Sequence, residues 1–315
     1  MLKRFRNSSE YHIQQQIREV IGRYGAELHE KVRIADIVDI DKLDRRELGT
    51  YALQSHFDFV LVDHDQIAVF AIEFDGPGHN SSYDAKKNSI CQQADLPLLR
   101  IYGFQEVREI NAMTLTRYLV ELVFHARFFQ QMKAEGQLDP TEPFALSGFI
   151  KDGAKHIFDS EFDFIVNAQE KLTRALQRHG LAEDPLPHLN INHLIMRSPD
   201  DELRAFIAIN STKGPLMGRS SVRISMPSPG FLADIGHINR EIGLFAEGMA
   251  SDDLLENIRL VGIGAGHVVT PTDELLAEIK DLGRQGFSFV DGGGPSHPEV
   301  DLLAAFAAGR GGKLF

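Results

Sequence analysis

The chain has 315 residues, 43% hydrophobic and 25% charged, and its formal net charge is -12. This composition is typical of a globular protein with one or two domains and a substantial core. Both halves are acidic: residues 1–150 carry 17 basic and 22 acidic side chains, and residues 151–315 carry 16 and 23. That balance excludes a protein that coats nucleic acid non-specifically, but not an enzyme that grips nucleic acid locally.

The single cysteine, Cys91, excludes an internal disulfide framework and suits a reducing compartment. The basic start of the chain has no apolar stretch behind it, so we expect no signal peptide. No uninterrupted apolar run approaches the roughly 20 residues that span a bilayer. We therefore expect a cytoplasmic protein without a membrane segment.

The first 135 residues show clear helical and strand patterns. Apolar residues recur at helical spacing near the start, and β-branched residues alternate further on. A short polar link between two apolar runs favours a hairpin. The predicted order is helix, strand, charged connector, two hairpin strands, helix, strand and long amphipathic helix, over 10–24, 32–40, 41–49, 57–63, 67–75, 83–94, 96–102 and 112–134.

A Gly- and Pro-containing stretch, residues 136–150, is the best candidate for a linker. We therefore predict a first domain over 1–135 and a second, α+β domain over 151–315. Its predicted elements are helices over 161–178, 232–247, from 272, and 298–308, and strands over 189–196, 204–209, 221–225, 260–263 and 287–290.

Two glycine-rich segments of the second domain look like ligand loops. Gly262–Gly266 resembles part of a phosphate-cradling loop, but an extended segment follows where the dinucleotide fingerprint needs a helix. Asp291–Pro295 follows a predicted strand, and a flexible turn is the favoured interpretation. No motif identifies the second domain's role, so substrate selection, homo-oligomerisation and binding of a partner protein all stay open.

Carboxylates interrupt the two apolar runs of the predicted hairpin. Asp58 lies in the first run, and Glu73 and Asp75 lie two residues apart near the end of the second. Side chains two apart in a strand share a face, and hairpin pairing can bring Asp58 beside them. Burying carboxylates is costly unless a cation compensates them. Three converging carboxylates therefore predict a site for Mg²⁺ or Mn²⁺, although strand-end acids facing solvent are the simpler alternative.

The spacing of these acids resembles a known nuclease pattern. Asp58, Glu73-x-Asp75, Gly76 and His79 are similar to the motif region of the PD-(D/E)XK nuclease superfamily. The closest likeness is to the branch related to the very-short-patch-repair endonucleases. Further segments that fit this branch, within about residues 9–105, are Val32–Asp36, Asp84 and Leu96–Arg100.

The resemblance implies an α/β restriction-endonuclease-like core, a mixed sheet flanked by helices. It implies a metal-dependent endonuclease that hydrolyses phosphodiester bonds, with DNA as the expected substrate and a role in bacterial defence or repair. Asp58 and Glu73 then hold Mg²⁺ or Mn²⁺, with Asp75 as a third ligand and Glu10 as a further acid from the first helix. An equally good explanation of Glu10 is that it lies in the first turn of a helix and complements the helix dipole.

Asp75 departs from the family pattern, because a catalytic lysine usually occupies its position. In related branches the lysine moves to the following helix, which makes Lys87 the candidate, with its neighbour Lys86 as an ordinary solvated lysine. If neither reaches the acids, His79 supplies the acid/base function. The missing lysine also supports an alternative: an inactive nuclease fold that binds nucleic acid or protein. A third hypothesis makes the second domain the effector and the first its sensor.

Overall fold

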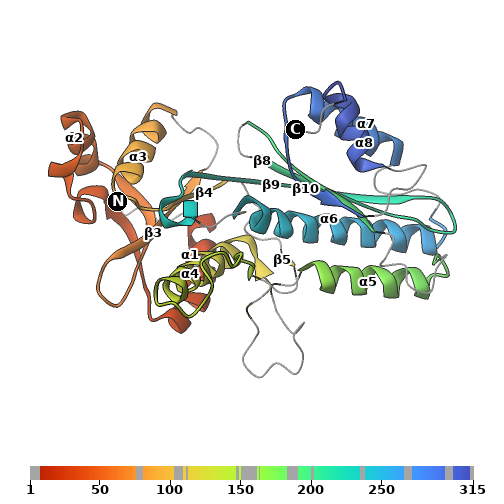
Figure 1. Cartoon of the computed structure of the whole chain (residues 1–315), viewed down its shortest axis with the longest axis horizontal. Coiled ribbons are helices and arrows are strands. Elements are labelled where there is room, and N and C mark those ends of the chain that lie inside the picture. The colour runs from red at the N-terminus through yellow and green to blue at the C-terminus, as the bar shows by residue number, and fades with distance from the viewer. Residues whose placement is uncertain are drawn as a thin grey trace, which may run out of the picture. The chain divides into compact units, whose positions relative to one another are not determined.

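The computed structural model describes residues 8–75, 81–102, 109–110, 113–146, 149, 162, 164–182, 191–199, 202–234, 238–265, 272–294 and 301–312 (Figure 1). The chain divides into two compact units. Unit 1 contains Met1–Leu146 and Arg223–Ile238, and unit 2 contains Ser147–Val222 and Asn239–Phe315. A short segment from the second half of the sequence therefore folds with the N-terminal residues.

Across the described residues, eight strands form a mixed sheet in the order β1-β2-β3-β4-β9-β8-β7-β10. Helices flank it, which agrees with the expected α/β class. These strands are β1 Glu27–Arg33, β2 His56–Val62, β3 Ala68–Asp75, β4 Leu98–Tyr102, β7 Asn192–Arg197, β8 Glu202–Ile209, β9 Leu216–Ser228 and β10 Ser288–Gly293. Two short strands, β5 Glu109–Ile110 and β6 Met113–Thr114, pair with each other.

The described helices are labelled as in Figure 1. None of them is both long and apolar enough to cross a membrane. They are α1 Ser8–Ile21, α2 Arg46–Gln54, α3 Ser81–Gln93, α4 Leu115–Ala134, α5 Phe164–Arg178, α6 Ile238–Gly262, α7 Thr272–Arg284 and α8 Leu302–Gly309.

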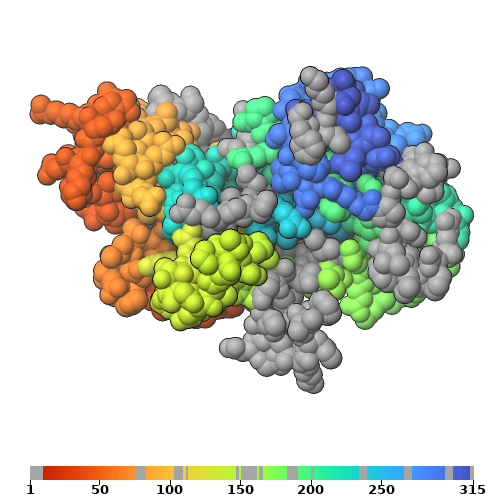
Figure 2. Space-filling view, viewed as in Figure 1, coloured from red at the N-terminus to blue at the C-terminus, as the bar shows by residue number. Residues whose placement is uncertain are grey.

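Unit 1 is built on the predicted hairpin. β2 pairs antiparallel with β1 and with β3, and α3 connects β3 to the parallel strand β4. Phe57, Val60 and Ala71 are buried in a core cluster to which α2 and α3 also contribute. α2 and α3 lie side by side at the surface (Figure 2), where the rings of Tyr51 and Tyr83 stack at 5.9 Å. α3 therefore packs against the two strands that carry the acids.

In unit 2, helices pack on both faces of β7–β10. The core cluster on one face joins strand residues such as Leu194 and Phe206 to α7 and α8. α6 lies so close to the strands that a Cβ on Gly218 would be 2.2 Å from the carbonyl oxygen of Ala250. Gly218 is therefore needed for this close approach of strand and helix.

Three element predictions are wrong. The strand predicted over 32–40 ends at Arg33, and a 3₁₀ turn begins at Ile34, whose amide donates to the Ser55 carbonyl. The connector predicted over 41–49 contains the start of α2, because apolar residues there pack against β2 instead of facing solvent. The strand predicted over 260–263 overlaps the last turn of α6, so the glycine segment that follows is a helix terminus.

Candidate functional site

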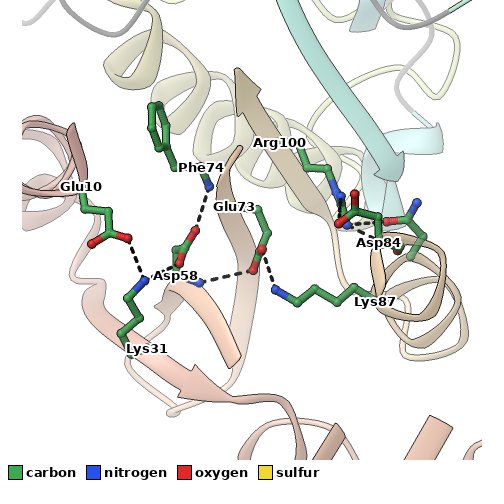
Figure 3. A network of polar contacts seen from close by, with 9 residues as sticks. Glu10, Lys31, Asp58, Glu73, Phe74, Asp84, Lys87 and Arg100 are labelled. Carbon is green, nitrogen blue, oxygen red and sulfur yellow. Dashed lines mark hydrogen bonds and ion pairs between the residues drawn. The ribbon is translucent and has the colours of Figure 1, made fainter. Parts of the chain in front are cut away.

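Asp58 and Glu73 face each other across the β2–β3 hairpin. Phe59 pairs with Ile72, so the preceding residue of β2 lies opposite the following residue of β3. The Asp58 amide donates to Glu73 Oε1 at 3.3 Å, and the Phe74 amide donates to Asp58 Oδ2 at 2.9 Å (Figure 3). The hairpin register therefore brings together the two acids that the sequence singled out.

Lys87 reaches this pair from α3. Its Nζ donates to Glu73 Oε2 at 2.6 Å, and the two side chains are only 14% and 4% exposed. Burial raises the pKa of Glu73 to about 7; Lys87 opposes that shift, while the charge of Asp58 adds to it. A carboxyl with this pKa changes protonation near neutral pH. A nearby cation favours its ionised form, so the charge of Glu73 depends on the cations beside it.

Lys31, which no sequence pattern indicated, contacts the other side of the pair. Its Nζ donates to Asp58 Oδ1 at 2.6 Å and to Glu10 Oε1 at 2.9 Å. Burial lowers the pKa of Lys31, but these two acids outweigh that effect and raise it overall. The residue has φ of +50°, a left-handed conformation that costs a non-glycine residue roughly 1–2 kcal/mol. No sequence signal pointed to it, because Lys31 precedes the strand predicted over 32–40, whereas β1 spans Glu27–Arg33.

Arg100 fixes the helix that carries Lys87. It is buried on β4, where its Nη1 lies 2.6 Å from Asp84 Oδ1 and its Nη2 donates to Asn88 Oδ1 at 2.9 Å. Asp84, Lys87 and Asn88 share one side of α3 because they are three and four residues apart. Of the two roles that Arg100 could have, phosphate contact or pairing with an acid, the structure contains the pairing.

Of the remaining predicted residues, only the Lys86 side chain lies within the described part of the chain, and it is directed away from the acids. Lys86 points to the Tyr51 ring, with Nζ 5.6 Å from the ring centroid. Asp75 ends β3, but its side chain and the whole of His79 lie outside the described residues. The structure thus unites Glu10, Asp58, Glu73 and Lys87 through direct contacts, and adds Lys31 (Figure 3).

The donor chemistry of this site suits Mg²⁺ or Mn²⁺, because its carboxylates supply the hard oxygens that these ions prefer. Within the ranges that the structure describes, no three His, Cys, Asp or Glu side chains are arranged to hold a metal ion. Instead, ammonium groups contact the acids that would bind one. Glu10, Asp58 and Glu73 therefore fit a divalent cation in chemistry, although they do not form a ready-made cage.

A second buried carboxyl, Glu247, lies on α6 in unit 2. It is 3% exposed, and its Oε2 has no hydrogen-bond partner among the described residues. Burial and the charge of Asp291 raise its pKa to about 7, while Arg240 opposes the shift. Arg240 pairs with Asp291 at 2.8 Å, so its charge compensates Glu247 only in part.

Glu247→Gln is expected to stabilise the protein at alkaline pH. The native state binds this proton more tightly than the unfolded chain does, so stability falls as pH rises from 4.5 to about 7. Above that window the variant should gain up to about 3 kcal/mol, and below it the gain should vanish. Urea unfolding from pH 4 to 8 measures the difference. Glu256→Gln, on the same helix but at the surface, where Arg259 pairs with Glu256, is the control; a pH-independent gain for Glu247→Gln would contradict the argument.

Residues 3–113 match the model of a family described as a protein of unknown function (DUF2726). The matched segment contains Glu10, Lys31, Asp58, Glu73 and Lys87, so it includes the whole contact network around the hairpin. No curated protein and no solved structure matches the chain. The chain is therefore similar over its first third to a family whose activity is unknown.

Proposed function

We propose that the protein is a metal-dependent nuclease that hydrolyses phosphodiester bonds, with DNA as the expected substrate. Unit 1 would supply a PD-(D/E)XK-like, restriction-endonuclease-like core. Its arrangement supports this reading: a helix, three antiparallel strands, a crossover helix and a strand parallel to the third. Such a fold alone does not determine activity, so the proposal depends on the site.

The observation that carries the proposal is the contact between Lys87 and Glu73 at 2.6 Å. The nuclease pattern needs a lysine beside the two acids, and Asp75 occupies the usual position of that lysine in the sequence. Lys87 approaches the acid pair from the next helix, which Arg100 holds against β4. The site therefore combines two opposed acids with an ammonium group, the set of charges that phosphodiester hydrolysis uses.

Asp58 and Glu73 would hold Mg²⁺ or Mn²⁺, with Glu10 as an additional acid. The bound ion would polarise the scissile phosphate and lower the pKa of an attacking water. Lys87 would place positive charge next to the phosphate oxygens, which become more negative as the water oxygen bonds to phosphorus. The bond from phosphorus to the leaving oxygen then breaks, and the two protons of the water pass to the leaving oxygen and to solvent.

The test is a cleavage assay with the full-length protein. Supercoiled plasmid, linear duplex DNA, single-stranded DNA and RNA are each incubated with Mg²⁺, Mn²⁺ or EDTA. We expect metal-dependent cutting of DNA that EDTA abolishes. Absence of cutting on every substrate with every metal, by a protein that is folded, would contradict the nuclease proposal.

An inactive nuclease fold that binds nucleic acid or a partner protein is the second candidate. One observation favours it: Lys31 and Lys87 already neutralise acids that a metal would need. The same incubations distinguish the two candidates when binding is measured beside cleavage by gel shift. Tight binding without cutting under any metal condition would support the binding module.

A further inference from the structure

The Lys31 ammonium lies between the two acids where a cation would be shared. Its Nζ is 2.9 Å from Glu10 Oε1 and 2.6 Å from Asp58 Oδ1 (Figure 3). A Mg²⁺ ion bonds to oxygen at about 2.0–2.1 Å, and Mn²⁺ is only slightly larger. An ion that bridges these same two oxygens would therefore have to lie close to the present position of Nζ. Two cations cannot occupy that space together.

The protein's own donors also fill the remaining oxygens of the acid pair. Phe74 N donates to Asp58 Oδ2, while Asp58 N and Lys87 Nζ donate to the two oxygens of Glu73. Of these donors, the backbone amides are fixed by the hairpin, whereas the two lysine side chains can rotate away. Lys31 has more freedom to do so, because its side chain is 36% exposed and that of Lys87 is 14% exposed.

The backbone conformation at Lys31 suggests that its side chain has two arrangements, bound to the acids or extended into solvent. A left-handed conformation in a lysine persists only where its surroundings impose it, and such positions gather at switches and active sites. The contacts of the Lys31 ammonium with Glu10 and Asp58 offset this backbone strain. Losing them to a metal ion would free the side chain to extend into solvent.

We propose that Lys31 is a tethered counter-ion that competes with the divalent cation for Glu10 and Asp58. This inference rests on the metal site of the proposed function and adds a form of regulation to it. When the Lys31 ammonium contacts Glu10 and Asp58, it compensates their negative charges, so the site is stable without a metal ion. When Lys31 swings out, the acids become available, so the apparent metal affinity is set by the fraction of molecules in that open arrangement.

The experiment measures Mn²⁺ binding to the full-length protein by isothermal titration calorimetry, without substrate. Lys31→Met removes the competing charge, and Lys31→Asn is the second variant because asparagine tolerates the left-handed backbone. Lys86→Met is the matched control, since Lys86 contacts Tyr51 instead of the acids. Asp58→Asn replaces one of the two contested carboxylates with a neutral amide, a much weaker ligand for a divalent cation. Thermal unfolding verifies that each variant is folded.

We expect both Lys31 variants to bind Mn²⁺ about tenfold or more tightly than the wild type, with Lys86→Met unchanged. Asp58→Asn should abolish the tight binding in the Lys31→Met background. If the wild type binds Mn²⁺ and the Lys31 variants bind no more tightly, competition by Lys31 is wrong while the metal site stands. If neither the wild type nor any Lys31 variant binds Mn²⁺, the metal site and the proposed nuclease mechanism both fail.

Discussion

Asp58→Asn is expected to reduce metal-dependent DNA cleavage by about 10³-fold or more, because it removes a charged ligand from the centre of the site. The substitution keeps the side chain's size, so the hairpin should remain intact. Cleavage of the best substrate at saturating Mn²⁺ measures the loss. Substrate binding, measured by gel shift, should change far less, because a substitution that affects only the chemical step leaves most contacts to the DNA backbone in place.

Asp63→Asn is the matched control for this variant. Asp63 immediately follows the same strand, and Arg127 pairs with it at 2.6 Å. That contact and nearby amides hold the pKa of Asp63 below its usual value despite burial, so its loss should cost stability. It should leave cleavage intact, because Asp63 lies at the opposite end of β2. Equal loss of activity in Asp58→Asn and Asp63→Asn would show that cleavage depends only on a correctly folded hairpin and would contradict a catalytic role of Asp58.

Lys87→Met is expected to destabilise the protein by about 1–2 kcal/mol more at pH 8 than at pH 5, because at pH 8 it leaves the buried Glu73 carboxylate without its partner. At pH 5 the cost should be smaller, since Glu73, with a pKa of about 7, is then mostly neutral. Adding Glu73→Gln to Lys87→Met removes both charges and should recover most of the lost stability. Urea unfolding of the single and double variants at both pH values measures these differences.

Lys86→Met controls for the loss of a lysine from α3. Its ammonium lies over an aromatic ring and outside the acid pair, so the expected cost is about 0.5–1 kcal/mol at either pH. A Lys87→Met cost that is the same at pH 5 and pH 8, or a double variant no more stable than Lys87→Met, would contradict an ion pair with Glu73. Cleavage should fall in Lys87→Met but not in Lys86→Met.

The elements that could be predicted are those whose signal is local. The hairpin over β2 and β3 is confirmed, because two apolar runs and a short polar link specify their own pairing. Helices α3 and α4 also appear at the expected places. For α4, the apolar residues at helical spacing match the face that the helix buries.

The errors occur where burial comes from distant parts of the chain. α6 is a 25-residue helix, and apolar residues surround it so widely that it lacks a single hydrophobic face. At the end of this helix, residues 260–263 form a short apolar run, and such a run cannot be assigned to helix or strand from its periodicity. The predictions for the segment around Ile34 and Leu48 are wrong because its apolar residues form short helical pieces that pack against β2.

The sequence by itself determined which acids meet. Asp58 and Glu73 belong to one hairpin, and a hairpin's register is decided by its own strands and turn. Only the tertiary structure decided which lysine reaches which acid. Lysine side chains are long and rotatable, so Lys86 and Lys87 are equivalent until Arg100 orients α3. Likewise, Lys31 meets Asp58 because β1 pairs with β2 and Lys31 adopts, within that strand, a positive φ that lysine does not favour locally.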